Sequence, residues 1–200
     1  MEIMHINSHF AVGVIFTSIL HSLFNFSLFE FLLVVLLSFI CDFDVFFAKY
    51  AINHNHRMLI SHSILPGLLV IIMGIIFNWP ALIFSGVTYS IHVIIDTFDW
   101  GTNFFYFQKK QIGLKLLISK EEFENLPKYL SEFKKAESFF DSKYYKSKIS
   151  LSIEVILFIL MVICNIFFAI EFILVSLFYF IGLYFHLSRH FFLRKTEKRK

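Results

Sequence analysis

The sequence predicts an all-α protein, a polytopic transmembrane helical bundle of about six spans. Hydrophobic residues make up 58% of the 200 residues and charged residues only 16%, against roughly 45–50% and about 25% in typical soluble domains. The mean hydropathy is +0.71, and apolar runs of the about 20 residues that cross a bilayer recur along the chain. A soluble domain of this length needs a more highly charged surface than this composition supplies, so we exclude that class.

The apolar runs divide the chain into four spans, a polar connection and a hairpin. The four expected spans cover residues 10–26, 29–48, 59–77 and 79–98. The apolar stretch 149–185 is too long for one span and predicts two, with a turn near 168–171. We therefore expect one domain overall, made of a four-span half (1–98), a cytoplasmic connection (99–148) and a two-span hairpin with a basic tail (149–200).

The connection between the fourth and fifth spans predicts a short amphipathic helix. Apolar residues recur at a roughly helical period from Glu121 to Phe140, among several Glu and Lys residues. Pro127 is poorly tolerated inside a helix, so the regular part can begin there. We expect this segment to lie on the membrane surface rather than to cross the bilayer.

The Lys and Arg residues predict the orientation of the chain. With six alternating spans, all 18 of them fall on the face that carries both termini, the 49–57 connection and the 99–148 segment. Cytoplasmic connections retain Lys and Arg, so we expect a multi-pass protein of the cell membrane with both termini in the cytoplasm. The basic tail indicates a topology anchor attracted to membrane lipid, and we expect no nucleic-acid partner.

Ionisable side chains gather at the cytoplasmic ends of the first four expected spans. Such groups are costly in hydrocarbon and tend to mark function. His9 begins the first span, Asp42 and Asp44 end the second, His56 and His62 open the third, and His92 and Asp96 end the fourth. This convergence from four separate segments is the main functional signal in the sequence.

Two of these pairs lie near the end of an expected helix. His92 and Asp96 are four residues apart and therefore share one helix face, a geometry that lets both side chains bind one ion. Asp42 and Asp44 are two residues apart and can converge only where the helix frays. We expect that fraying at the end of the second span.

The histidines that open the third span do not share a helix face. His56 and His62 are six residues apart, so His56 is expected in the connection and His62 in the first helical turn. Ser61 can cap that helix. His54 is expected to be an interfacial residue by itself.

Neutral imidazoles together with carboxylates favour divalent ions such as zinc, manganese or iron. Six or seven potential ligands exceed the three or four that one zinc ion needs, which allows two ions or one ion with additional bases around it. Zinc or manganese is favoured. A metal-bound hydroxide would then hydrolyse an ester or phosphoester, with Asp44 or Asp96 transferring the proton. The depth of the cluster points to a lipid head group as substrate.

The ordered set of motifs resembles the YdjM-type family of membrane-bound metal-dependent hydrolases. The resemblance covers about residues 9–101, half of the chain, and is carried by Ser8-His9, Cys41-Asp42-Phe43-Asp44, the stretch His56 to Ser63, His92-Val93-Ile94-Ile95-Asp96 and Trp100-Gly101. It implies a helical membrane enzyme whose metal-centre residues are His9, Asp42, Asp44, His56, His62, His92 and Asp96.

The chain departs from the pattern of that family at three points. Cys41 stands where the family usually has Pro, and Val45 stands where a His often follows the second Asp. The gap from His56 to His62 is one residue longer than the commonest form, so either His54 or His56 can align. The resemblance therefore supports the metal site more than it defines a substrate.

Two non-catalytic functions fit the same residues. A metal carrier needs ligands at the bilayer midplane and a polar path across it, but the opposite leaflet is nearly devoid of polar residues. A structural membrane protein needs the His/Asp cluster only for hydrogen bonds. Arg57 can bind a lipid phosphate or balance the aspartates, and we favour the balancing role. We expect Cys41 and Cys164 to be reduced packing residues.

Overall fold

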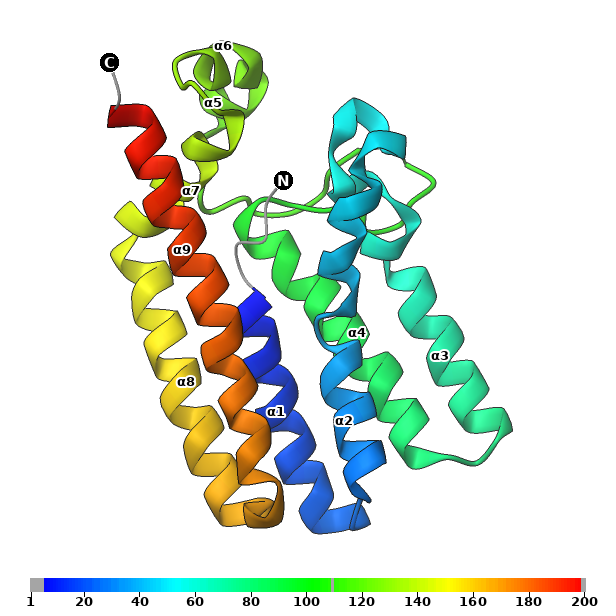
Figure 1. Ribbon diagram of the computed structural model, residues 1–200. Helices are drawn as coiled ribbons and strands as arrows, with labels where there is room; N and C mark the ends of the chain where they lie inside the picture. Colours follow the sequence, from blue (N-terminus) through cyan, green and yellow to red (C-terminus); the bar gives the residue numbers. More distant parts are fainter. Residues whose placement is uncertain (1–5, 109, 199–200) are drawn as a thin grey trace.

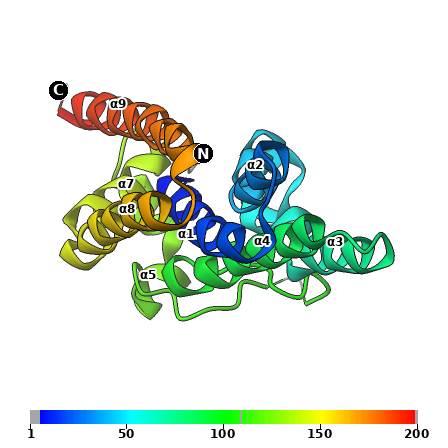
Figure 2. The ribbon, with the colours of Figure 1, turned by 90° about the horizontal axis from the view of Figure 1, so that it is seen from below.

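The computed structural model describes residues 6–108 and 110–198, and no β-strand occurs within them. The prediction of an all-α protein is confirmed. Six long segments run roughly alongside one another (Figure 1): α1 (Ile6–Phe24), α2 (Leu28–Leu37), α3 (Ile64–Ile76), α4 (Pro80–Asp99), α8 (Lys148–Phe168) and α9 (Phe178–Lys198). Figure 2 shows α1 between the α8–α9 pair on one side and α2 and α4 on the other.

Shorter segments complete the described chain. The 3₁₀ segments are η1 (Ile40–Tyr50), η2 (Ile52–His54), η3 (His56–Met58) and η4 (Ile60–His62), which connect α2 to α3, and η5 (Ile170–Leu177), which precedes α9. Three short helices, α5 (Lys120–Glu124), α6 (Leu126–Ser131) and α7 (Ala136–Lys146), lie between α4 and α8.

Several of these helices are long and apolar enough to cross a membrane, which marks a membrane protein. Among the described residues, α1, α4, α8 and the η5–α9 segment pass this test individually. The pair α2 and η1 passes it together but is bent by 41°. α3 has 13 residues, fewer than the about 20 of a straight crossing. The described chain thus has four such spans, or five with the bent pair, where the sequence predicts about six.

The second span is broken because side-chain hydrogen bonds define both ends of α2. At its start, the Ser27 amide donates to Glu30 Oε2 (2.9 Å), and the Glu30 amide donates to the Ser27 hydroxyl (3.4 Å), which is a capping box. At its end, the Ser38 hydroxyl donates to the carbonyls of Val35 (2.7 Å) and His9 (3.0 Å). The expected fraying is found beyond Ser38, where η1 carries Asp42 and Asp44.

α3 and α4 form a closely packed hairpin because two glycines face each other. A Cβ atom on Gly86 would lie 2.5 Å from the carbonyl oxygen of Gly67, and small residues of this kind let helices in membranes approach. The helix cap differs from the prediction: the Ser63 hydroxyl accepts from the Leu65 amide (3.4 Å). Ser61, the predicted cap, instead donates its hydroxyl to Asp44.

The single amphipathic helix expected from 121 to 140 is wrong. The segment forms three short helices, because Pro127 is compatible with the first turn of α6 but not with a helix that continues through it. Its apolar side chains pack around Trp100 and Tyr144. The expected turn near 168–171 is confirmed by the break at Ala169, although α9 continues to Lys198, well beyond the predicted end at residue 185.

Candidate metal centre

The seven predicted ligands converge from separate elements and are all buried. α1 contributes His9, η1 contributes Asp42 and Asp44, η3 and η4 contribute His56 and His62, and α4 contributes His92 and Asp96; none is more than 8% exposed. This convergence is possible because α2 and α3 are short. The space beside the last turns of α4 is therefore filled by the 3₁₀ segments.

The first group of potential ligands comprises His9, Asp42, His92 and Asp96. Each offers one ligand atom, and these atoms lie within 4.8 Å of one another. His9 Nε2 lies 3.3 Å from Asp96 Oδ1, and His92 Nε2 lies 3.5 Å from Asp96 Oδ2 and 3.6 Å from Asp42 Oδ1. The four-residue spacing of His92 and Asp96 thus places both side chains in one site, as predicted.

A backbone carbonyl determines the tautomer of His92. Its Nδ1 donates to the carbonyl oxygen of Ser38 at 2.8 Å, so the proton of the neutral ring is on Nδ1 and Nε2 carries a lone pair. That lone pair faces the carboxylates of Asp42 and Asp96, which are also acceptors. Acceptors facing acceptors in a buried site repel one another unless a cation lies between them or a second proton makes the ring an imidazolium. A fixed Nδ1–H is the usual arrangement of a metal-binding His.

The second group comprises Asp44, His56 and His62, which also offer ligand atoms within 4.8 Å of one another. Asp44 accepts from His56 Nδ1 (2.9 Å), from His62 Nδ1 (2.6 Å) and from the Ser61 hydroxyl. Burial lowers the pKa of His56, although its hydrogen bond to Asp44 opposes this shift. In this arrangement Asp44 orients both imidazoles.

His62 connects the two groups. Nδ1 donates to Asp44, so Nε2 of the neutral ring carries the lone pair. This Nε2 lies 3.3 Å from Asp96 Oδ2 and 3.8 Å from Asp42 Oδ1. The same conflict between acceptors therefore occurs at His62 as at His92. Two imidazoles from different elements direct lone pairs at the same two carboxylates.

Many of these buried ligand atoms lack a hydrogen bond, which costs free energy unless something binds them. Within the described part of the chain, no hydrogen bond is made by Nε2 of His9, His56, His62 or His92, by Asp42 Oδ2 or by either carboxylate oxygen of Asp96. Imidazole nitrogens and carboxylate oxygens are the ligands that zinc and manganese accept. The donor set fits a divalent ion.

Arg57 compensates only part of the negative charge. Its guanidinium lies 3.3 Å from Asp96 Oδ1 and 3.0 Å from Asp99 Oδ1, and it also donates to the carbonyl of Asp96. This agrees with the expected balancing role. With neutral imidazoles, the three buried carboxylates Asp42, Asp44 and Asp96 carry three negative charges, and the one buried guanidinium contacts only Asp96 of the three. The site then has a surplus of negative charge that favours a cation.

Residues that the sequence did not single out hold η3 and η4 against α4. The Thr102 hydroxyl donates to the carbonyl of His62 (2.6 Å), and the Asn103 amide donates to the carbonyl of Arg57 (3.0 Å). The Tyr89 hydroxyl donates to the carbonyl of Ser61. The position of Thr102 and Asn103 directly after the Trp100-Gly101 motif is the one sequence signal that could have indicated them.

Cys41 lies at the metal centre as well. It was expected to be only a packing residue, but its sulfur can form a third group of potential ligands with His62 and His92. Sequence spacing does not indicate this group, because its members are 21 and 30 residues apart. Adjacency to Asp42 was the only available signal.

Histidines outside the cluster have other surroundings. His54 is exposed in η2 and is absent from the groups of potential ligands, which contain His56. His21 contacts Glu171 (2.7 Å), and His190 contacts Asp141 (2.7 Å). Each of these two histidines is thus paired with a carboxylate outside the cluster.

A cavity of about 960 Å³ adjoins the cluster. His56 and Arg57 line it on one side, together with Lys49 of η1, while Trp100 and residues of α6 and α7 line the other side. The cavity provides space for a small molecule next to the buried ligands. Its lining combines charged groups with aromatic and aliphatic ones.

Comparison with known proteins assigns no function to the chain. No protein-family model, no curated protein and no solved structure matches it. The fold and the site together define a class: a helical membrane protein with a buried His/Asp cluster that can hold a cation.

Proposed function

We propose that the protein is an integral membrane metal-dependent hydrolase that binds one or two divalent ions, zinc or manganese. The observation that carries the proposal is the orientation of His62 and His92, whose Nε2 lone pairs face the carboxylates of Asp42 and Asp96. The resemblance of the motifs to the YdjM-type family supports the same function.

In this proposal the residues of the cluster have distinct roles. His9, His92, Asp42 and Asp96 hold the ion, and His62 approaches it from the second group. A bound divalent ion supplies Lewis acidity and lowers the pKa of water toward 7, so that water can attack an ester or phosphoester at neutral pH. Asp44 and Asp96 stay the two candidates for proton transfer. The oxygens of Asp44 accept hydrogen bonds from His56, Ser61 and His62, and Asp96 could transfer a proton only through an oxygen that does not hold the ion.

The adjoining cavity supports an amphiphilic substrate. Lys49 and Arg57 on its wall suit an anionic group, and Trp100, Phe123 and Phe140 suit an apolar one. We propose an ester or phosphoester such as a lipid head group, which would reach the ligands past His56.

We further propose six spans, with both termini in the cytoplasm and the protein in the cell membrane. α3 packs along α4 through Gly67 and Gly86, so it follows the direction of a helix that is long enough to cross. The segregation of all 18 Lys and Arg residues to one face supports the orientation.

Metal analysis of purified protein tests the proposed site. We expect about one or two divalent ions per chain in the wild type, the number that this donor set can hold. His62→Ala and Asp96→Ala should lose most of this metal. His190→Ala, a histidine of α9 paired with Asp141, is the matched control and should keep it.

Equal metal content in all four proteins would overturn the site. It would leave a hydrogen-bonded cluster whose charge is balanced by protons on the imidazoles. A second outcome would overturn the hydrolase and favour a metal carrier. In that outcome the metal content depends on His62 and Asp96, but the metal-loaded protein hydrolyses no ester or phosphoester.

A further inference from the structure

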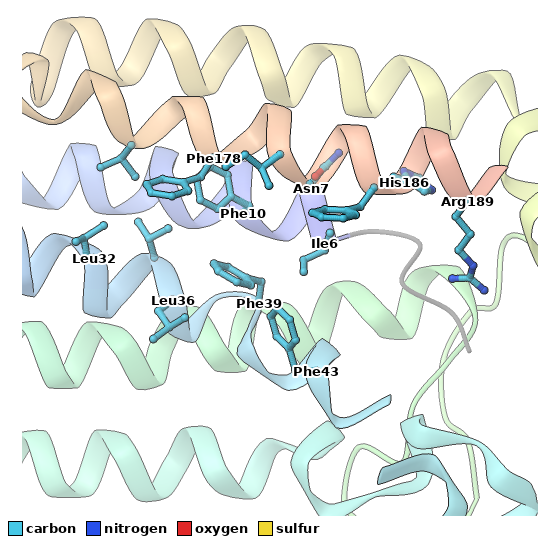
Figure 3. Close-up of a pocket in the computed structure, with 15 residues that line it drawn as sticks. Ile6, Asn7, Phe10, Leu32, Leu36, Phe39, Phe43, Phe178, His186 and Arg189 are labelled. Carbon is cyan, nitrogen blue, oxygen red and sulfur yellow. The ribbon is translucent and has the colours of Figure 1, made fainter. Parts of the chain in front are cut away.

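A second cavity, of about 540 Å³, lies against a different face of α1 from the face that carries His9. Its walls come from α1, from α2 and the start of η1, and from η5 and α9 (Figure 3). Phe10 lines it, whereas the neighbouring His9 belongs to the metal centre. The volume lies within the range of about 300–1,000 Å³ that is usual for sites that bind small molecules.

The lining of this groove is polar at one end only. Leu32, Phe178 and the other apolar side chains form most of the wall, and the polar side chains are Asn7, His186 and Arg189. Figure 3 shows all three toward the end where α9 approaches its C-terminus, with Arg189 beyond the apolar part. The groove therefore has the polarity of a lipid, with a long apolar part and a charged end.

The dimensions of the groove correspond to one leaflet of a bilayer. Phe178 and Arg189 are both on its wall and are eleven residues apart on α9. At 1.5 Å per residue this separation is about 16 Å, close to half of the about 30 Å hydrocarbon thickness. With Phe178 near the midplane, Arg189 reaches the level of the head groups.

Asn7 is a buried polar residue in the wall of the groove, packed against α9. It is 2% exposed, and its Nδ2 makes no hydrogen bond within the described residues. Its position depends on Gly182, where a Cβ atom would lie only 2.2 Å from Asn7 Oδ1. With so little exposed surface, this amide packs against α9 and is not open to a ligand in the groove.

Arg189 gives the groove its charge preference. Glu137 of α7 interacts electrostatically with it, so the guanidinium is not isolated, but the groove itself contains no acidic side chain among the residues that line it. A guanidinium at head-group depth binds phosphate through charge-assisted hydrogen bonds, and anionic lipids attract such groups.

We propose that this groove binds one acyl chain of an anionic phospholipid from the leaflet on the side of the C-terminus. The phosphate contacts Arg189, and the chain lies along Phe10, Phe39 and Phe178. This lipid is a ligand rather than the substrate of the metal centre, because the two sites lie against different faces of α1. The proposal therefore does not depend on the hydrolase function.

Native mass spectrometry of the detergent-solubilised protein tests this proposal with dioleoyl phosphatidylglycerol and dioleoyl phosphatidylcholine. Wild type should bind the anionic lipid about tenfold more tightly, as expected for one charge-assisted contact. Arg189→Gln should remove this preference. The matched control Arg194→Gln changes an exposed cation of the same helix outside the groove and should keep it.

A second pair of variants tests the apolar part. Leu36→Trp fills the groove and should weaken binding of both lipids, whereas Leu69→Trp, on the exposed side of α3, should not. The proposal would be overturned by equal binding of the two lipids to the wild type. It would also be overturned if Arg194→Gln lost the preference to the same extent as Arg189→Gln, or if Leu36→Trp bound both lipids like the wild type.

Discussion

The carbonyl oxygen of Ser38 determines which nitrogen of His92 can bind a cation. This hydrogen bond joins residues 54 positions apart in the sequence and depends on the exact end of α2. The sequence indicates that His92 and Asp96 share a helix face, but it contains no information about the backbone group behind the ring. The metal-binding tautomer is therefore a product of the tertiary structure.

At the scale of single residues, removing the charge of Asp44 and removing the charge of Asp96 should lower the metal affinity by different amounts. Asp96→Asn removes a carboxylate that faces three histidines and should abolish metal binding. Asp44→Asn removes a group that orients His56 and His62, and such outer groups typically contribute about 10–100-fold to metal affinity. Competition with a chromogenic chelator measures both affinities. Complete loss of binding in Asp44→Asn would show instead that Asp44 is itself a ligand.

Arg57 should matter for stability. Its guanidinium is buried beside Asp96, and removing one partner of a buried ion pair costs about 3–5 kcal/mol because the remaining charge is uncompensated. Arg57→Met should therefore lower the midpoint of thermal unfolding of the metal-free protein in detergent. Lys120→Met, which removes an exposed ion pair with Glu124, is the control. Equal midpoints for the two variants would contradict the role of Arg57 as a buried counter-charge.

At the scale of elements, the hairpin of α3 and α4 positions the ligands of both helices. η4 leads directly into α3, so any displacement of α3 from α4 moves His62 away from His92 and Asp96. The close approach at Gly67 and Gly86 prevents that displacement. Small residues in apolar helices can be recognised in a sequence, but their pairing across two helices cannot.

The variant Gly86→Ala tests whether metal binding depends on the close packing of α3 against α4. The added methyl group would meet the Gly67 carbonyl at 2.5 Å, and overpacking of this kind typically costs about 1–3 kcal/mol. We expect a lower unfolding midpoint and a lower metal content measured on the same sample. Leu69→Ala, on the exposed face of α3, should change neither. Wild-type metal content in Gly86→Ala would show that the site tolerates movement of the hairpin.

At the scale of the whole molecule, the proposed topology can be tested with cysteine labelling. In six alternating spans, Phe77 at the end of α3 and Lys195 near the end of α9 lie on opposite sides of the membrane. A membrane-impermeant maleimide should label Phe77→Cys in intact cells, and Lys195→Cys only after permeabilisation. The same accessibility for both positions would indicate that α3 and α4 re-enter from one side.

The bundle also separates two binding regions. The cavity beside His56 and Arg57 adjoins the metal centre, and the groove beside Phe10 and Arg189 lies against a different face of α1 from the face that carries His9. Because α1 carries His9 on one side and Phe10 on another, one helix forms part of both regions. Two adjacent residues in a sequence can therefore serve different sites.

The sequence by itself indicated the class of the molecule and seven residues of the cluster, but not Cys41. Long apolar runs require a helical membrane protein, because only helices satisfy their own backbone hydrogen bonds in lipid along such runs. The rarity of ionisable groups in those runs identified the groups to expect together: His9, Asp42, Asp44, His56, His62, His92 and Asp96.

The tertiary structure alone decided how these groups are arranged. Four features depend on contacts between residues far apart in the chain: the break after Ser38, the start of α3 at Ile64 rather than at residue 59, the orienting role of Asp44, and the proximity of Cys41. Local propensity cannot encode such contacts, because each partner is brought into place only when the helices pack.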